Sequence, residues 1–98
     1  SIQDEIVQYD SYAFEVKEVY PNPFNPATEV EFTIPSDGFV ELSAFNVMGQ
    51  KVTGIYSGYQ STGQHSYTWN ASDLPSGVYY VQLRQGGHIQ TTKAMLMK

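Results

Sequence analysis

Short segments in which apolar and polar side chains alternate recur along the chain, and this pattern restricts it to β structure. The clearest segment, residues 28–34, has the sequence Thr-Glu-Val-Glu-Phe-Thr-Ile. A period of two places its apolar side chains on a buried face and its polar side chains in water. No segment of useful length has the period of an α-helix, so we expect no helical layer.

Turn-forming residues divide the chain into such segments. Glycine, proline, asparagine and aspartate recur at intervals of about 8–12 residues, which is typical of a sandwich built from hairpins. Parallel strands are not expected, because they need long crossover connections. We therefore predict an all-β fold, an immunoglobulin-like antiparallel β-sandwich of about seven strands. The expected strands are residues 13–19, 28–34, 39–47, 51–56, 64–70, 77–85 and 89–98, with residues 57–63 as a loop.

The length of 98 residues suits a single domain, and without cysteine no disulfide can reinforce its core. Residues 1–12 are polar and mixed in character, and we interpret them as a linker or the remnant of an upstream domain. The sandwich is expected at residues 13–98. The first residues lack the basic region and apolar core of a signal peptide. We therefore interpret the chain as a module of a longer protein whose export signal lies upstream.

The charge and motif content disfavour several functions. A formal net charge of −5 disfavours nucleic acids and anionic membrane surfaces as partners, because both are polyanions. No apolar run approaches the roughly 20 residues of a transmembrane helix, so no transmembrane segment is expected. His65 and His88 flank turns, and we interpret both as surface residues rather than members of a catalytic triad. We predict no enzyme, no metal and no cofactor, since neither metal-ligand spacing nor a phosphate-binding loop is evident.

A proline-rich segment follows the first expected strand. Its prolines fix φ and remove backbone donors, and each favours extended geometry in the residue before it. Its asparagines can bond the local backbone in Asx turns. We predict a stiff, ordered loop that seals one end of the sandwich. The segment consists of Pro21, Asn22, Pro23, Phe24, Asn25 and Pro26.

Aromatic residues are numerous in the second half of the chain. Alternation places one group inward, where large rings bury the most area per residue. The inward rings are those of Tyr67, Trp69 and Tyr79. The other rings could stack on sugars from an exposed face, which leaves a carbohydrate-binding module as an alternative function. These rings are those of Tyr56, Tyr59 and Tyr80.

Five segments together resemble the C-terminal sorting domains of the type IX secretion system. Each is a turn-and-strand pattern of modest specificity, but their order and spacing from about Phe14 to Lys98 are specific. Two asparagines, Asn46 and Asn70, stand where the family often has aspartate. The segments are the proline loop with residues 28–32, residues 40–49 ending at Gly49, residues 63–65 with Trp69, residues 74–80, and residues 93–98.

The resemblance implies a sorting signal that directs a larger cargo protein across the outer membrane. It implies as partners the outer-membrane translocon, a C-terminal signal peptidase or sortase, and an N-terminal cargo domain. It also implies transit through the periplasm, removal at the cell surface, and a final location at the surface or outside the cell. The end of the chain at Lys98 fits a terminal signal.

The last strand and its neighbours are the expected recognition site. If this strand lies at a sheet edge, its unpaired backbone groups could be extended by a partner strand. The residues expected at this site are Gly77, Tyr79, Lys93, Met95, Leu96 and Lys98. The proline loop, Gly49 and Trp69 are expected to be structural.

Fold alone does not choose among the functions that such a sandwich can serve. Besides the sorting signal, the sequence leaves open the carbohydrate-binding module and a structural immunoglobulin-like spacer of a secreted enzyme. The spacer would be similar to the domain of flagellar hook-capping proteins.

Overall fold

The computed structural model describes residues 12–98. This part of the chain contains seven strands and no helix. The all-β prediction is therefore confirmed, with seven strands as expected. The prediction for residues 1–12 lies outside the described residues except at Tyr12. The strands are β1 (Glu15–Tyr20), β2 (Ala27–Ile34), β3 (Gly38–Asn46), β4 (Lys51–Gln60), β5 (Gly63–Asn70), β6 (Gly77–Gln85) and β7 (His88–Leu96).

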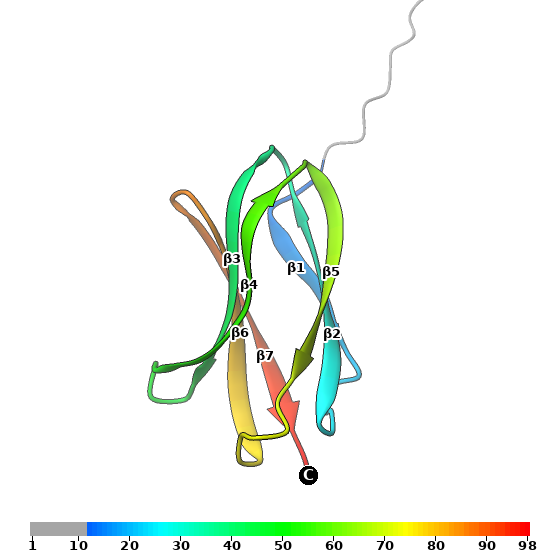
Figure 1. Ribbon diagram of the computed structural model, residues 1–98, viewed down its shortest axis with the longest axis vertical. Helices are drawn as coiled ribbons and strands as arrows, with labels where there is room; N and C mark the ends of the chain where they lie inside the picture. The colour runs from blue at the N-terminus through cyan, green and yellow to red at the C-terminus, as the bar shows by residue number, and fades with distance from the viewer. Residues whose placement is uncertain (1–11) are drawn as a thin grey trace, which may run out of the picture.

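The strands form two antiparallel sheets that pack face to face (Figure 1). The first sheet has the order β1-β2-β5, and the second has the order β4-β3-β6-β7. The neighbours β2 and β5, like β3 and β6, are not consecutive in the chain, so connections cross between the sheets as in immunoglobulin-like folds. Within residues 12–98 the structure contains no helix suited in length and hydropathy to cross a membrane.

The core lies between the sheets and follows the alternation in the sequence. In β2, Val30, Phe32 and Ile34 are fully buried, while Glu29 on the opposite face is exposed. The second sheet contributes the alternate residues of β3 and β6 to the same core. These are Val40, Leu42, Ala44, Tyr79, Val81 and Leu83.

Strand β4 is longer than the sequence indicated. The prediction of a loop at residues 57–63 is therefore wrong for most of this segment. The strand continues to Gln60, so only Ser61 and Thr62 separate it from β5. Serine and glycine weaken an isolated strand, but here β3 supplies pairing partners, with Val40 opposite Gly58. Non-local hydrogen bonding therefore outweighs a weak local preference.

The inward face of the last strand, which its apolar run leaves ambiguous, is decided by its register with β6. Ala94 lies opposite Tyr79, and Leu96 lies opposite Gly77. Ala94 and Leu96 are buried, whereas Met95 is 39% exposed. The register thus places the methionine on the outer face of the sheet.

Candidate functional site

One end of the sandwich brings together the segments that the sequence singled out. Strands β1, β5 and β7 end there, and β2 and β6 begin there (Figure 1). The proline loop, the connection between β5 and β6, and the C-terminus of the chain therefore lie close together. Hydrogen bonds join these three segments.

The proline loop pairs with β7 as a short additional strand. The backbone N–H of Phe24 donates to the carbonyl of Met95 at 2.9 Å, and the N–H of Met97 donates to the carbonyl of Phe24 at 2.9 Å. The side chain of Asn22 extends this pairing. Its Oδ1 accepts from the N–H of Met95 at 2.9 Å, and its Nδ2 donates to the carbonyl of Lys93 at 3.2 Å.

This pairing changes the expectation for the edge of the last strand. Strand β7 does lie at the edge of its sheet. Its outward backbone groups between Lys93 and Met97, however, already bond Asn22 and Phe24. A partner strand could extend this part of the edge only by displacing the proline loop.

The same loop is anchored to the other sheet, so it ties the two sheets together. The hydroxyl of Thr28 on β2 donates to the carbonyl of Pro21 at 2.7 Å. The N–H of Ala71, directly after β5, donates to the carbonyl of Pro26 at 2.8 Å. Proline has a carbonyl acceptor but no N–H, which suits a loop that only accepts at these two positions.

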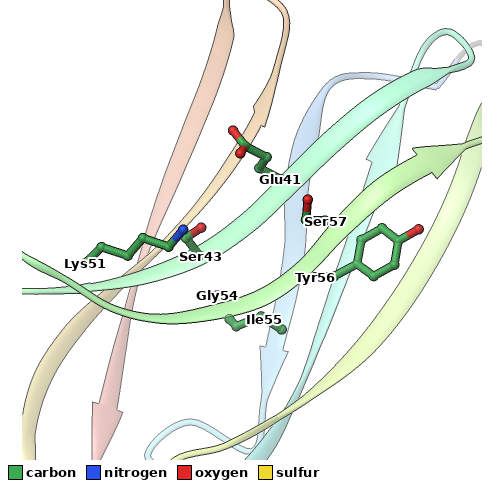
Figure 2. A pocket seen from close by; sticks show the side chains of 7 residues that line it. All are labelled: Glu41, Ser43, Lys51, Gly54, Ile55, Tyr56 and Ser57. Atoms are coloured by element: carbon green, nitrogen blue, oxygen red, sulfur yellow. The ribbon is translucent and has the colours of Figure 1, made fainter.

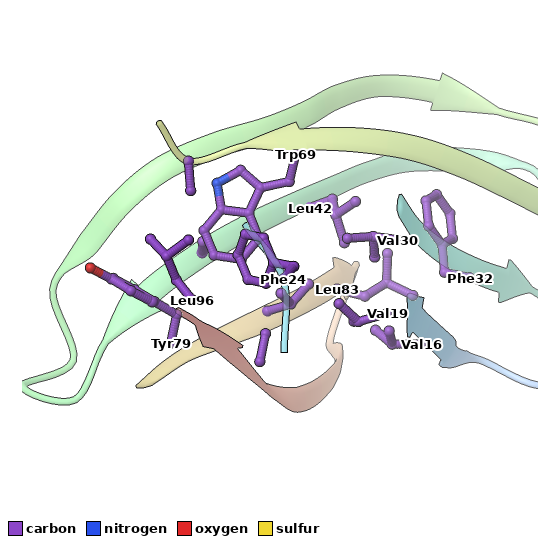
Figure 3. Close-up of a cluster of buried hydrophobic side chains, with 14 of the residues drawn as sticks. Val16, Val19, Phe24, Val30, Phe32, Leu42, Trp69, Tyr79, Leu83 and Leu96 are labelled. Atoms are coloured by element: carbon purple, nitrogen blue, oxygen red, sulfur yellow. The ribbon is translucent and has the colours of Figure 1, made fainter. Parts of the chain in front are cut away.

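Three aromatic rings close the core beneath the loop (Figure 3). Phe24 is 2% exposed, and its ring centroid lies 5.0 Å from that of Trp69. The ring of Tyr79 meets Trp69 edge-on at 5.9 Å and 84°. The prediction that Trp69 and Tyr79 point inward is confirmed, while Tyr67, the third ring expected inward, packs against the core but is only half-buried. Phe24 places the loop over this end of the sandwich. The indole Nε1 of Trp69 is buried and has no acceptor among the described residues, so Trp69 acts here through packing.

Tyr79 also fixes the connection between β5 and β6. Its hydroxyl donates to the carbonyl of Pro75 at 2.6 Å. A tyrosine near the start of this strand that bonds the backbone a few residues upstream is the tyrosine corner of immunoglobulin-like sandwiches. A turn closed by a bond from the N–H of Leu74 to the carbonyl of Ala71, 3.0 Å long, completes the connection.

The last residue of the chain is bound to this connection. The N–H of Lys98 donates to Ser76 Oγ at 3.0 Å, and its Nζ donates to the carbonyl of Ser72 at 2.6 Å. These bonds hold the C-terminus against the β5–β6 connection.

The expected site residues divide into two groups at this end. Tyr79 and Leu96 are buried in the core. The remaining expected residues are exposed, namely Gly77, Lys93, Met95 and Lys98. Gly49 lies in the β3–β4 turn with φ +83°, a left-handed conformation that glycine adopts without steric cost.

Sequence reasoning missed two features of this end. It treated Asn22 only as a turn residue, although its amide group pairs with β7, and no local signal could reveal a partner more than 70 positions away. It also did not foresee that Met95 and Met97 would be exposed there, at 39% and 56%. Methionine is a flexible apolar residue that is common at binding surfaces.

The histidines weighed for catalysis and Tyr56, weighed for sugar binding, lie away from this end. Within residues 12–98, no group of three or more His, Cys, Asp or Glu side chains is placed to hold a metal ion. His65 Nε2 lies 2.7 Å from the carbonyl of Ser61, and the ring centroid of His88 lies 5.5 Å from that of Phe14. Tyr56 is not an exposed platform for a sugar, because its ring stacks on Tyr67 at 4.1 Å.

These features define an immunoglobulin-like β-sandwich module whose terminal strand is built into one sealed end. Residues 18–98 match the family model described as the secretion system C-terminal sorting domain, and the chain belongs to this family. The resemblance to type IX sorting domains is thereby confirmed. No curated protein matches the chain.

Membership of this family establishes the role in outline. The domain is a C-terminal sorting signal of type IX secretion, and the family is not an enzyme family. Such a domain implies a cargo and the type IX machinery as partners, and export to the cell surface or the extracellular space.

Proposed function

We propose that the sealed end of the sandwich is the surface on which the outer-membrane translocon docks to export a cargo through the type IX system. The cargo first crosses the inner membrane and passes through the periplasm. A C-terminal signal peptidase or sortase then removes the module at the cell surface. The module itself, residues 13–98, is not catalytic, and residues 1–12 link it to the cargo.

The observation that carries this proposal is the row of side chains presented by the end of β7. The family match includes this strand, and Asn22 and Phe24 hold its backbone from Lys93 to Met97. Alternation then directs Lys93, Met95 and Met97 outward, and all three are exposed. A rigid backbone lowers the entropy that a partner must remove on binding.

Within this site the expected residues have different roles. Lys93, Met95 and Lys98 are exposed and contact the translocon, while Gly77 lies beside them opposite Leu96. Tyr79 and Leu96 are positioning residues, because their side chains are buried beneath the row. Recognition uses side chains rather than strand addition, since the backbone groups of this segment are already bonded.

An export assay tests the proposal. The chain is fused behind a fluorescent carrier that has an inner-membrane export signal, and the fusion is produced in a host with a type IX system. We expect the carrier at the cell surface or in the medium, and in the periplasm when the module is omitted. A carrier that stays in the periplasm despite the intact module contradicts the proposed function.

Two matched variants of β7 locate the docking surface. Met95→Ser removes an exposed apolar side chain at the sealed end, and Ile89→Ser removes one of similar exposure, 49% against 39%, at the other end of the strand. We expect Met95→Ser to reduce export about tenfold, the effect of losing one interface anchor, and Ile89→Ser to change it by less than about twofold. Equal effects of the two variants would place recognition elsewhere.

A further inference from the structure

The outer face of the four-stranded sheet carries three of the five basic residues of the chain, namely Lys51, Arg84 and Lys93. All three are exposed and belong to β4, β6 and β7. The register places Lys51 opposite Phe45, Phe45 opposite Tyr80, and Tyr80 opposite Lys93. One row across the sheet therefore has a cation at each end and two aromatic rings between them.

This face is hollowed along β3. Two adjacent hollows of about 390 and 180 Å³ share Glu41, Ser43 and Lys51. Arg84 lines the second hollow from β6. Small residues form the floor, since Ser43 lies opposite Gly54 in the register. Figure 2 shows the first hollow, with Tyr56 pointing away from it towards β5.

The side chain of Lys51 lies over the floor of the first hollow. Its Nζ lies 3.8 Å from the point where a Cβ on Gly54 would be. The hollows thus have the ammonium of Lys51 on the β4 side and the guanidinium of Arg84 on the β6 side, with Ser43 and Glu41 of β3 also lining them. A guanidinium binds carboxylates in a bidentate geometry, and an ammonium binds them as a point charge.

The opposite outer face has the opposite charge. On the three-stranded sheet, the outward positions of β1 and β2 carry four glutamates, Glu15, Glu18, Glu29 and Glu31. The molecule is therefore polarised across its thickness, although its formal net charge is −5. An acidic partner is repelled by one face and attracted by the other.

We propose that the hollowed outer face of the four-stranded sheet binds an acidic, extended protein segment. Lys51 and Arg84 contact its carboxylates, and Ser43 and Gln82 are placed to bond its backbone. A uniform polyanion, such as an anionic bilayer or a nucleic acid, fits less well. Glu41 lines both hollows and repels unbroken negative charge, whereas a segment with spaced carboxylates can place an uncharged residue beside it. The hollows are lined by residues of β3, β4 and β6 and by none of the docking residues of the sealed end, so their test does not depend on export.

Titration of the isotope-labelled chain, followed by the shifts of its amide resonances, tests this proposal. The probe is a short peptide of alternating glutamate and alanine, and the control probe replaces glutamate with lysine. We expect shifts on β3, β4 and β6 with the acidic peptide only, and we expect added salt to reduce them. Binding of the lysine peptide with equal strength, or shifts centred on β1 and β2, would overturn the proposal.

Two variants that change the net charge by the same amount distinguish an effect of the hollows from an effect of net charge. Lys51→Gln combined with Arg84→Gln lowers the net charge by two, as does Lys17→Glu on β1 of the other sheet. We expect the double variant to weaken peptide binding about fivefold and Lys17→Glu to change it by less than about twofold. All the substituted residues are exposed, so unchanged spectra away from the sites verify folding.

The control variant and a lipid comparison complete the test. Equal weakening by Lys17→Glu would show an effect of net charge alone and would overturn the site. Stronger binding to phosphatidylglycerol vesicles than to the acidic peptide would also overturn it, in favour of a membrane surface.

Discussion

Tyr79 and Tyr80 are neighbours in β6, but the pleat of the strand gives them different surroundings. Tyr79 is 4% exposed, packs against Trp69 and bonds the carbonyl of Pro75. Tyr80 is half-buried on the outer face, opposite Lys93. One residue therefore supports the sealed end, while the other lies on the cationic face.

This difference predicts unequal effects of the same substitution. Tyr79→Phe leaves the carbonyl of Pro75 without its part-buried donor, so the free energy of unfolding should fall by about 1–1.5 kcal/mol. Tyr80→Phe should change it by less than about 0.5 kcal/mol. Urea unfolding of the two variants measures this, and equal values would remove the structural role assigned to the Tyr79 hydroxyl.

The proline loop pairs with β7, which would otherwise be an open edge strand of its sheet. The sheet order β4-β3-β6-β7 gains Phe24 as a short parallel partner of Leu96. An edge strand with free donors and acceptors invites pairing with other chains, and a loop laid over it prevents this. The loop therefore protects the segment that the translocon is proposed to recognise.

Asn22 is the part of the loop that can be tested without disturbing the core. Asn22→Ala removes the acceptor of the Met95 N–H, so exchange of that amide with solvent should become about tenfold faster. Asn25→Ala, at the exposed second asparagine of the loop, should leave it unchanged. Amide hydrogen exchange resolved by residue makes the measurement. Equal protection of Met95 in both variants would show that the Asn22 bond contributes little.

At the scale of the whole molecule, the two outer faces differ in their polar interactions as well as in charge. On the acidic face, Glu29 accepts a hydrogen bond from Ser66 Oγ at 2.6 Å and another from the Thr68 hydroxyl. Both hydrogen bonds lower the pKa of Glu29 below its ordinary value of 4.5, and the bond from Ser66 has the larger effect. Both hydroxyls come from β5, so the carboxylate joins two strands of the sheet.

The stability of the molecule should therefore depend on pH through this carboxylate. A carboxyl group with a lowered pKa in the folded state stabilises the fold above its ordinary, unfolded pKa, and this contribution is lost as the pH falls through the folded value. Glu29→Gln should lower the melting temperature at neutral pH, and the difference from the unmodified chain should disappear in acid. Ser66→Ala combined with Thr68→Ala should remove the same pH-dependent contribution to the melting temperature. A difference that persists in acid would contradict this account.

Local patterns in the sequence determined the all-β class, the inward faces of β2 and β6, the turn at Gly49 and the stiff proline loop. Each depends on a period of two or on the φ restrictions of single residues, which are properties of short segments. The order and spacing of such segments also sufficed to indicate the family.

Tertiary structure alone decided the length of β4, the inward side of the last strand, the pairing of Asn22 with Met95 and the separation of charge between the faces. Gly58 remains in a strand only because β3 bonds it, and Leu96 points inward only because β6 sets its register. These features depend on partners that are distant in the chain. A short segment cannot reveal them, because register and sheet order arise only when the strands assemble.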